Sequence, residues 1–185
     1  MPSAEADLAA ATARRTHPSV FGMVLFLASE LMFFGGLFAA YFTLRSLNSA
    51  WPPPGVRLEV PLTVVATALL TLSSFTMHAG IGRLRRGEVG RMRGWIALTF
   101  SLGAAFLAIK AYELATAGFG IGSHAYGSLF FTMLGAHGLH LLVGLVLLVV
   151  VLARTAEART EAVGYYWHFV DVVWLAIFGT VYLAR

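Results

Sequence analysis

The sequence predicts an all-α integral membrane protein built as a bundle of five transmembrane helices. Of its 185 residues, 58% are hydrophobic and only 12% are charged, and the mean hydropathy is +0.78. These values exclude an ordinary soluble domain. A helix needs about 20 predominantly apolar residues to span a membrane, and the chain offers five such stretches.

The chain begins with a segment that we expect to be a polar cytoplasmic tail, residues 1–17. The apolar stretch after it is too long for a cleaved signal sequence, so no signal peptide is expected. Trp51 and the three prolines after it predict an interfacial loop, because proline cannot donate to the helical hydrogen-bond ladder. One membrane domain is expected over residues 18–185, with helices at about 18–44, 60–82, 94–117, 126–153 and 164–184.

The arginines indicate the orientation. Nine lie in the tail and in the loops after the second and fourth helices, against three on the opposite side. Because cytoplasmic loops of membrane proteins are enriched in Lys and Arg, the N-terminus is expected in the cytoplasm and the C-terminus outside. The same rule explains the net charge of +4, so no nucleic-acid partner is expected.

Candidate functional residues are the ionisable side chains inside the spans, where an unpaired polar group is costly. Cys is absent, so any metal would need His and carboxylate ligands. Glu30 near the bilayer midplane is either a protonated acid bonded to a neighbouring helix or a proton-exchanging group. His137 and His140 share a helix face and either form hydrogen bonds between helices, which we favour, or ligate haem or a metal.

Two further pairs are expected. Lys110 and Glu113 predict an ion pair, with either a third partner or snorkelling of the side chains toward the outer face. His168 and Asp171 lie three residues apart on the last helix and, with His78, fall in the cytoplasmic third. A structural His–Asp contact between helices is favoured, because no serine, threonine or cysteine stands out as a nucleophile for an intramembrane hydrolase.

Four segments of the chain together resemble subunit III of haem–copper oxidases of the cytochrome c oxidase type. The resemblance covers nearly the whole chain from Pro18, with the segments in the order of the family. They are Leu-Phe-Leu-Ala-Ser-Glu-Leu-Met-Phe-Phe at 25–34, Tyr-Gly-Ser-Leu-Phe-Phe at 126–131, His-Gly-Leu-His at 137–140 followed by Gly144, and Tyr-Trp-His-Phe-Val-Asp-Val-Val-Trp-Leu at 166–175.

The resemblance implies a non-catalytic subunit in a proton-pumping terminal oxidase of aerobic respiration. It implies no catalytic, cofactor-binding or metal-binding residue in this chain, with haem and copper held by partner subunits I and II. Such a subunit binds subunit I directly and stabilises it, binds phospholipids, and supports proton uptake and oxygen access. The expected location is the bacterial cytoplasmic (inner) membrane, with other respiratory complexes as further partners.

The resemblance also carries over to particular residues. Glu30 matches the carbodiimide-reactive glutamate of the family, and Phe26 and Arg154 are candidate lipid contacts. Four side chains carry over as buried polar positions: His137, His140, His168 and Asp171. The longer form of the family has seven helices, two of which form a lipid cleft with the other five, so this chain alone is not expected to build that cleft.

Other functions remain as alternatives. Five-helix chains also resemble subunit III of ubiquinol oxidases and a homologue associated with nitric-oxide reductase. From different classes come a stand-alone membrane cytochrome that uses His137 and His140, and a transporter.

Overall fold

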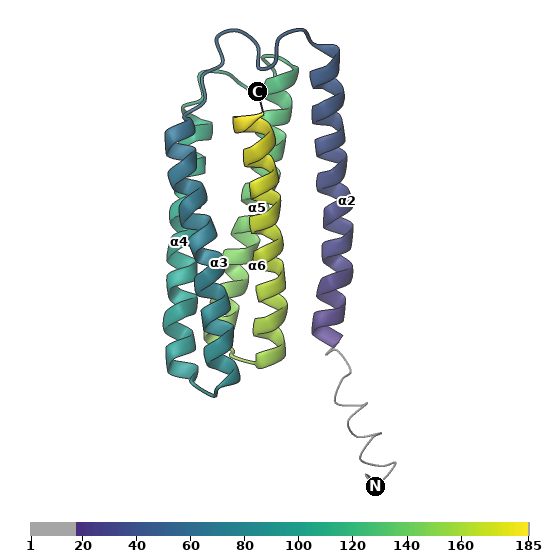
Figure 1. The fold of residues 1–185 in the computed structure, drawn as a ribbon. Helices are drawn as coiled ribbons and strands as arrows, with labels where there is room; N and C mark the ends of the chain where they lie inside the picture. Colours follow the sequence, from purple (N-terminus) through teal and green to yellow (C-terminus); the bar gives the residue numbers. More distant parts are fainter. Residues whose placement is uncertain (1–17, 185) are drawn as a thin grey trace.

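The computed structural model describes residues 18–184, which form an elongated bundle of five long helices (Figure 1). All five are long and apolar enough to cross a membrane, so the expected all-helical, multi-pass fold is confirmed. The predicted tail, residues 1–17, lies outside the described residues, and the orientation stays a prediction. The helices are α2 (Pro18–Leu47), α3 (Val60–Arg85), α4 (Val89–Ala115), α5 (Ala125–Ala153) and α6 (Glu157–Ile177), which η1 (Phe178–Leu183) continues as a π-helix.

Several helices extend beyond the apolar stretches from which they were predicted. Helix α3 continues to Arg85, and α4 begins at Val89 after a turn in which Gly87 has a φ of +75°. Helix α6 begins seven residues before Gly164, at Glu157. Hydropathy marks the part of a helix that suits lipid, whereas backbone hydrogen bonds continue wherever polar side chains remain solvated.

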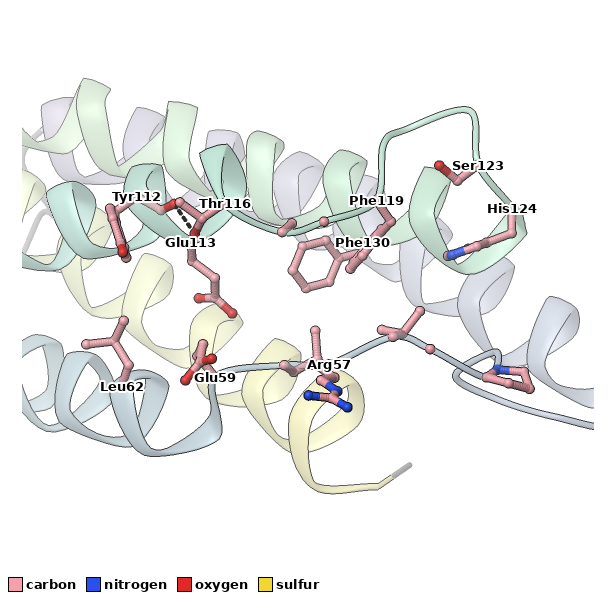
Figure 2. A pocket seen from close by; sticks show the side chains of 16 residues that line it. Arg57, Glu59, Leu62, Tyr112, Glu113, Thr116, Phe119, Ser123, His124 and Phe130 are labelled. Carbon is pink, nitrogen blue, oxygen red and sulfur yellow. Dashed lines mark hydrogen bonds between the residues drawn. The ribbon is translucent and has the colours of Figure 1, made fainter.

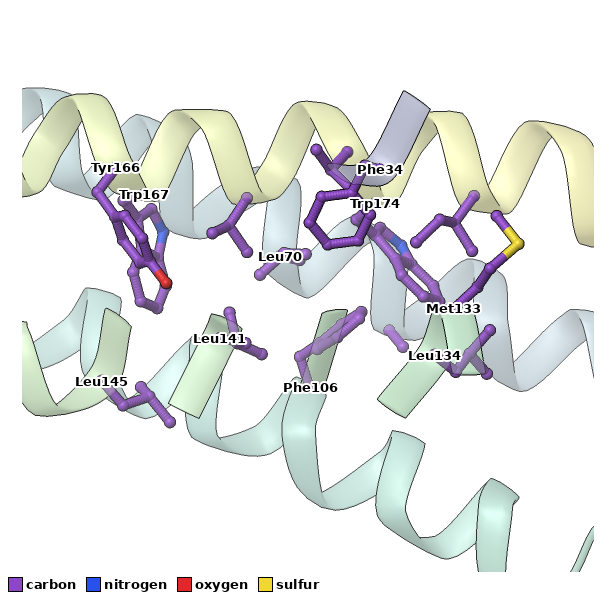
Figure 3. Close-up of a cluster of buried hydrophobic side chains, with 14 of the residues drawn as sticks. Phe34, Leu70, Phe106, Met133, Leu134, Leu141, Leu145, Tyr166, Trp167 and Trp174 are labelled. Carbon is purple, nitrogen blue, oxygen red and sulfur yellow. The ribbon is translucent and has the colours of Figure 1, made fainter. Parts of the chain in front are cut away.

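Helix α6 is the centre of the bundle. It packs against α3, α5 and α2, whereas α2 packs mainly against α6 and α5 (Figure 1). Figure 3 shows Trp167 and Trp174 of α6 among the leucines and Phe106 of the core. Close packing at Trp167 needs a glycine on α4, because a Cβ added to Gly103 would lie 2.6 Å from the indole ring. The indole Nε1 also donates to Ser73 Oγ at 2.9 Å, which fixes the ring.

The bundle has two chemically different ends. The basic end carries the α3–α4 turn and the α5–α6 loop, and Arg85 forms an ion pair there with Glu161 at 2.7 Å. The arginines of this end also act on Glu88: Arg91, followed by Arg83, donates hydrogen bonds that hold the pKa of its carboxyl below the usual value.

The opposite end, which we call the proline end, carries the α2–α3 and α4–α5 loops. A cavity of about 860 Å³ lies between them. Figure 2 shows Arg57 and Glu59 on one side of it and Phe119 and His124 on the other. Trp51 packs edge-to-face against Tyr126, with ring centroids 5.2 Å apart, so the predicted loop tryptophan joins the end of the bundle core.

The predicted Lys110–Glu113 ion pair is present inside this end of the bundle. The Lys110 Nζ lies 2.6 Å from Glu113 Oε2, and both side chains are about 5% exposed. Lys110 also donates to Thr63 Oγ1 at 2.8 Å, and the Tyr182 hydroxyl donates to Glu113 Oε1 at 2.9 Å. The pair therefore has two further partners, Thr63 of α3 and Tyr182 of η1, where at most one was expected. It joins α4 to α3 and to η1.

Candidate functional site

The first candidate site joins Glu30 of α2 to His140 of α5. The Glu30 Oε2 lies 2.8 Å from His140 Nε2. The two side chains are 19% and 16% exposed, so the pair sits at the outer surface of the bundle rather than in its core. Two residues that the sequence singled out separately thus form one contact across 110 residues of chain.

The hydrogen bonds of His140 determine how many protons the pair holds. The His140 Nδ1 lies 2.7 Å from the carbonyl oxygen of Ala136, and a carbonyl can only accept, so Nδ1 carries a hydrogen. The contact between Nε2 and Glu30 then needs one proton, on either atom. The pair is a neutral acid beside a neutral imidazole or a carboxylate beside an imidazolium, and both forms have no net charge. It can therefore exchange a proton internally without placing an unbalanced charge in the membrane.

Aromatic side chains surround the pair. Phe34 packs edge-to-face against the His140 ring at 5.1 Å, and Phe33 stacks on it at 6.2 Å. The Tyr166 hydroxyl donates to the His140 carbonyl oxygen at 2.8 Å, which links α6 to the same site. Phe26 stacks on Tyr166 at 6.3 Å. This apolar shell limits the access of water to the Glu30–His140 contact.

His137 does not join this site. It is buried against Phe106 and Trp174, with ring centroids 5.8 and 5.1 Å away. Neither ring nitrogen has a hydrogen-bond partner within residues 18–184, so the hydrogen bond expected between helices is not seen there. Residues three apart on a helix point about 60° from each other. That angle separates His140, which faces α2, from His137, which faces α4 and α6.

A second polar cluster joins α3 to α6. The Ser74 hydroxyl of α3 lies 2.9 Å from His168 Nδ1 and donates a hydrogen bond to Asp171 Oδ2. Ser74 is thus a serine beside His168 and Asp171 that the sequence did not indicate as a possible nucleophile. The sequence gives no signal for Ser74, because a serine inside an apolar helix commonly donates a hydrogen bond to a backbone carbonyl of its own helix, as Ser29 does to Phe26.

The order of the second cluster is not that of a hydrolase. In a serine hydrolase triad, the imidazole lies between the serine that it activates and the carboxylate that orients it. Here the serine lies between the other two, and its hydroxyl bonds the carboxylate. The His168 ring therefore has no orienting acid, and the hydrolase alternative has no support from this geometry.

The two lipid candidates lie near the basic end. Phe26 is 45% exposed on α2, so its ring covers Tyr166 on one side and is accessible on the other. Arg154 is exposed directly after α5, and its carbonyl accepts a hydrogen bond from Arg159 at 2.8 Å. Both side chains are accessible to a lipid, and their roles stay predictions.

The described residues contain no group of three or more His, Asp or Glu side chains that could hold a metal ion. The chemistry that the sites offer is thus hydrogen bonding and proton exchange at Glu30–His140 and at Ser74–His168–Asp171. Tyr166 and Ser74 are site residues for which the sequence predicts no hydrogen bond between helices. The only signal for Tyr166 was its place in an aromatic run.

Comparisons with known proteins bear on the whole chain. The family described as cytochrome c oxidase subunit III matches residues 5–184. A probable cytochrome c oxidase subunit 3 from Nocardia farcinica is 44% identical over 176 residues, which cover 89% of this chain and 87% of the relative. A cytochrome c oxidase subunit 3 from Thermostichus vulcanus is 38% identical over 181 residues, or 90% and 89% of the two chains. A further one, from Synechocystis, is 40% identical over 90% of this chain and 77% of its own length.

Proposed function

Because the chain belongs to the cytochrome c oxidase subunit III family, we propose that it works as the non-catalytic subunit III of a proton-pumping haem–copper oxidase. Haem and copper would be bound by subunits I and II, where oxygen is reduced. The relatives are named as subunits of cytochrome c oxidases, which favours cytochrome c over quinol as the electron donor. The family match over residues 5–184 is the observation that carries this proposal.

The proposed place of the chain is the bacterial cytoplasmic membrane. The arginines at the basic end favour the cytoplasm for that end, since positively charged loops stay on the cytoplasmic side. The C-terminal end of η1 lies at the proline end, which would then be outside. Subunit I would be the direct partner, subunit II a member of the same complex, and phospholipids the surrounding ligands.

Within this complex, the Glu30–His140 pair supports a role at the boundary with lipid or a partner subunit. Helix α2 exposes large apolar side chains along much of its length, including Met32 at 80% and Leu31 at 64%. A glutamate and histidine pair without net charge can stay in such surroundings, whereas a lone carboxylate there would be costly. The proposed tasks of this face are to stabilise subunit I, to hold lipid at Phe26 and Arg154, and to support oxygen access and proton uptake.

The test is removal of the chain from the purified oxidase. Initial oxygen consumption should largely persist, because the redox centres stay in subunits I and II, while the number of turnovers before inactivation should fall. Adding the purified chain back should restore the longer lifetime. Immediate loss of activity with subunits I and II still assembled would overturn the supporting role.

A substitution at the first site gives a second test. Glu30→Gln should remove labelling by a hydrophobic carbodiimide, which needs a carboxyl group, and should leave the haem spectra of the complex unchanged. Glu161→Gln, at the basic end, is the matched control and should keep the labelling of Glu30. Haem absorbance in the isolated chain, or its loss from the complex in Glu30→Gln, would instead support a membrane cytochrome.

A further inference from the structure

The helices α3 and α6 carry a continuous polar stripe from the basic end toward the middle of the bundle. On α3 it consists of Arg85, His78 and Ser74, which follow one another at intervals of seven and four residues. On α6, Glu161, His168 and Asp171 recur at intervals of seven and three. These intervals keep the side chains of each helix on one face. The stripe runs for about 15 Å at 1.5 Å per residue.

The outer part of the stripe is a cavity. It has a volume of about 210 Å³ and is lined by His78, Arg85, Glu161, Tyr165 and His168, among others. A water molecule occupies about 30 Å³ in the liquid, so the cavity has room for several. Arg85 donates two hydrogen bonds to Glu161 at its mouth, at 2.9 and 2.7 Å. The cavity thus extends from the Arg85–Glu161 ion pair to the His168 ring, with ionisable side chains along it and room for several water molecules.

The inner part of the stripe is the Ser74–His168–Asp171 cluster, and its hydrogen atoms can be counted. The Ser74 hydroxyl has one hydrogen, which it gives to Asp171 when the carboxyl is ionised. The His168 Nδ1 must then carry a hydrogen and donate it to Ser74 Oγ, across 2.9 Å. The opposite arrangement also satisfies every group: a protonated Asp171 donates to Ser74, and Ser74 donates to His168 Nδ1.

The second arrangement holds one more proton than the first. That proton enters at one end of a chain of hydrogen bonds, and each group passes its own hydrogen to the next. A proton that binds His168 Nε2 from the cavity allows Nδ1 to release its hydrogen to Ser74 Oγ, while Ser74 passes its own hydrogen to Asp171 Oδ2. The products are a neutral imidazole with its hydrogen on Nε2, an intact hydroxyl and a neutral carboxylic acid. No electron moves, and the water in the cavity supplies and receives the proton.

The burial of Asp171 favours the protonated acid as the end of this route. The residue is 6% exposed, and its Oδ1 has no hydrogen-bond partner within residues 18–184. A buried carboxylate oxygen without a donor is costly, and a neutral carboxyl reduces that cost. The titratable groups that line the cavity beside His168 come from α3 and α6, namely His78, Arg85, Glu161 and Tyr165, and among them His78 acts electrostatically on His168.

We infer that Ser74, His168 and Asp171 form a proton-holding site, which fills and empties through the α3–α6 cavity at the basic end. His168 accepts the proton from water, Ser74 relays it and Asp171 holds it. The site goes beyond the proposed supporting role and depends on it only for the assignment of the basic end to the cytoplasm. Its ligand is a proton, and the first candidate site, Glu30–His140, has no part in it.

Infrared difference spectroscopy of the assembled oxidase tests the site. We expect a protonated-carboxyl signal that disappears in Asp171→Asn and that shifts after transfer into D₂O. In Ser74→Ala, the exchange of the Asp171 carboxyl hydrogen for deuterium should slow about a hundredfold, which is the lower end of what a positioned proton-transfer group contributes. Ser74→Thr keeps the hydroxyl and should restore the exchange rate. Ser101→Ala, an exposed serine that bonds its own helix, should leave the rate unchanged.

Two results would overturn the inference. One is the absence of any Asp171-dependent carboxyl signal across the pH range in which the complex is stable. The other is exchange at the normal rate in Ser74→Ala. If that variant does not assemble, His168→Gln replaces it, because an amide can hydrogen-bond Ser74 but cannot carry a proton onward. Oxygen consumption enters neither measurement, so a negative result would leave the proposed subunit III function standing.

Discussion

Removing one charge of the buried Lys110–Glu113 pair should destabilise the bundle far more than removing both. The pair is about 5% exposed, and Lys110 Nζ lies 4.7 Å from the Trp174 ring centroid. Lys110→Met leaves the Glu113 carboxylate without its cation, and Glu113→Leu leaves the ammonium without its anion. Each loss should cost about 3–5 kcal/mol, the usual cost of breaking a buried pair from one side.

The double variant Lys110→Met with Glu113→Leu removes both charges and therefore avoids that cost. It still deprives the Tyr182 hydroxyl of its acceptor, which should cost about 1–3 kcal/mol. The two single effects would sum to about 6–10 kcal/mol, so the double variant should fall short of additivity by several kcal/mol. Unfolding by SDS in mixed micelles, followed by tryptophan fluorescence, measures these free energies.

A second ion pair of the same spacing is the control. Glu88 and Arg91 are also three residues apart and lie 3.1 Å from each other, but the Arg91 side chain is 70% exposed. Because solvent screens such a pair, Arg91→Met should change the free energy of unfolding by less than about 1 kcal/mol. Single Lys110 or Glu113 variants that cost no more than this control, or that simply add in the double variant, would refute the reasoning.

Two further predictions concern packing and pH. Gly103→Ala should destabilise the bundle by about 1–3 kcal/mol, because the new Cβ would lie 2.6 Å from the Trp167 ring. Gly94→Ala is the control and should be neutral or stabilising, because its new Cβ meets nothing within 4 Å. Equal effects of the two variants on unfolding in SDS would argue against the close contact at Trp167. Since Arg91 lowers the pKa of Glu88, the stabilisation from Glu88 should be present above the usual pKa of glutamate and should disappear as the pH falls through the lowered value. Thermal melting of wild type and Glu88→Gln should therefore differ at neutral pH and converge in acid, and a difference independent of pH would contradict this.

The number and order of the helices could be predicted because each membrane span needs a long apolar stretch, and the chain has five. The ends could not, because polar turns such as Glu157–Val163 continue a helix without adding to its hydropathy. Lys110 and Glu113 were predicted as a pair because their spacing within one helix fixes the contact.

Contacts between helices were harder to predict. Glu30 and His140 were both recognised as candidates, but their pairing depends on how α2 and α5 rotate toward each other, which packing determines. Ser74 gave no signal at all, because a hydroxyl in an apolar helix can be satisfied by the helix itself. The ionisable side chains inside the apolar spans located the candidate residues, and the hydrogen bonds that relate them needed the structure.

The position of α2 has a consequence for the synthesis of the chain. Helix α2 is made before the other described helices, yet it packs mainly against α5 and α6, which follow 78 residues or more after its end. The contact between Glu30 and His140 can form only after a further 110 residues have been made. Their synthesis takes about 5–20 s at usual translation rates. During that interval the Glu30 carboxyl lies in the membrane without its histidine, and the Glu30–His140 pair forms only when the fourth described span, α5, arrives. The described bundle can therefore close only after α6 has been made, so α2, which precedes the other described helices, is among the last to be fixed in place.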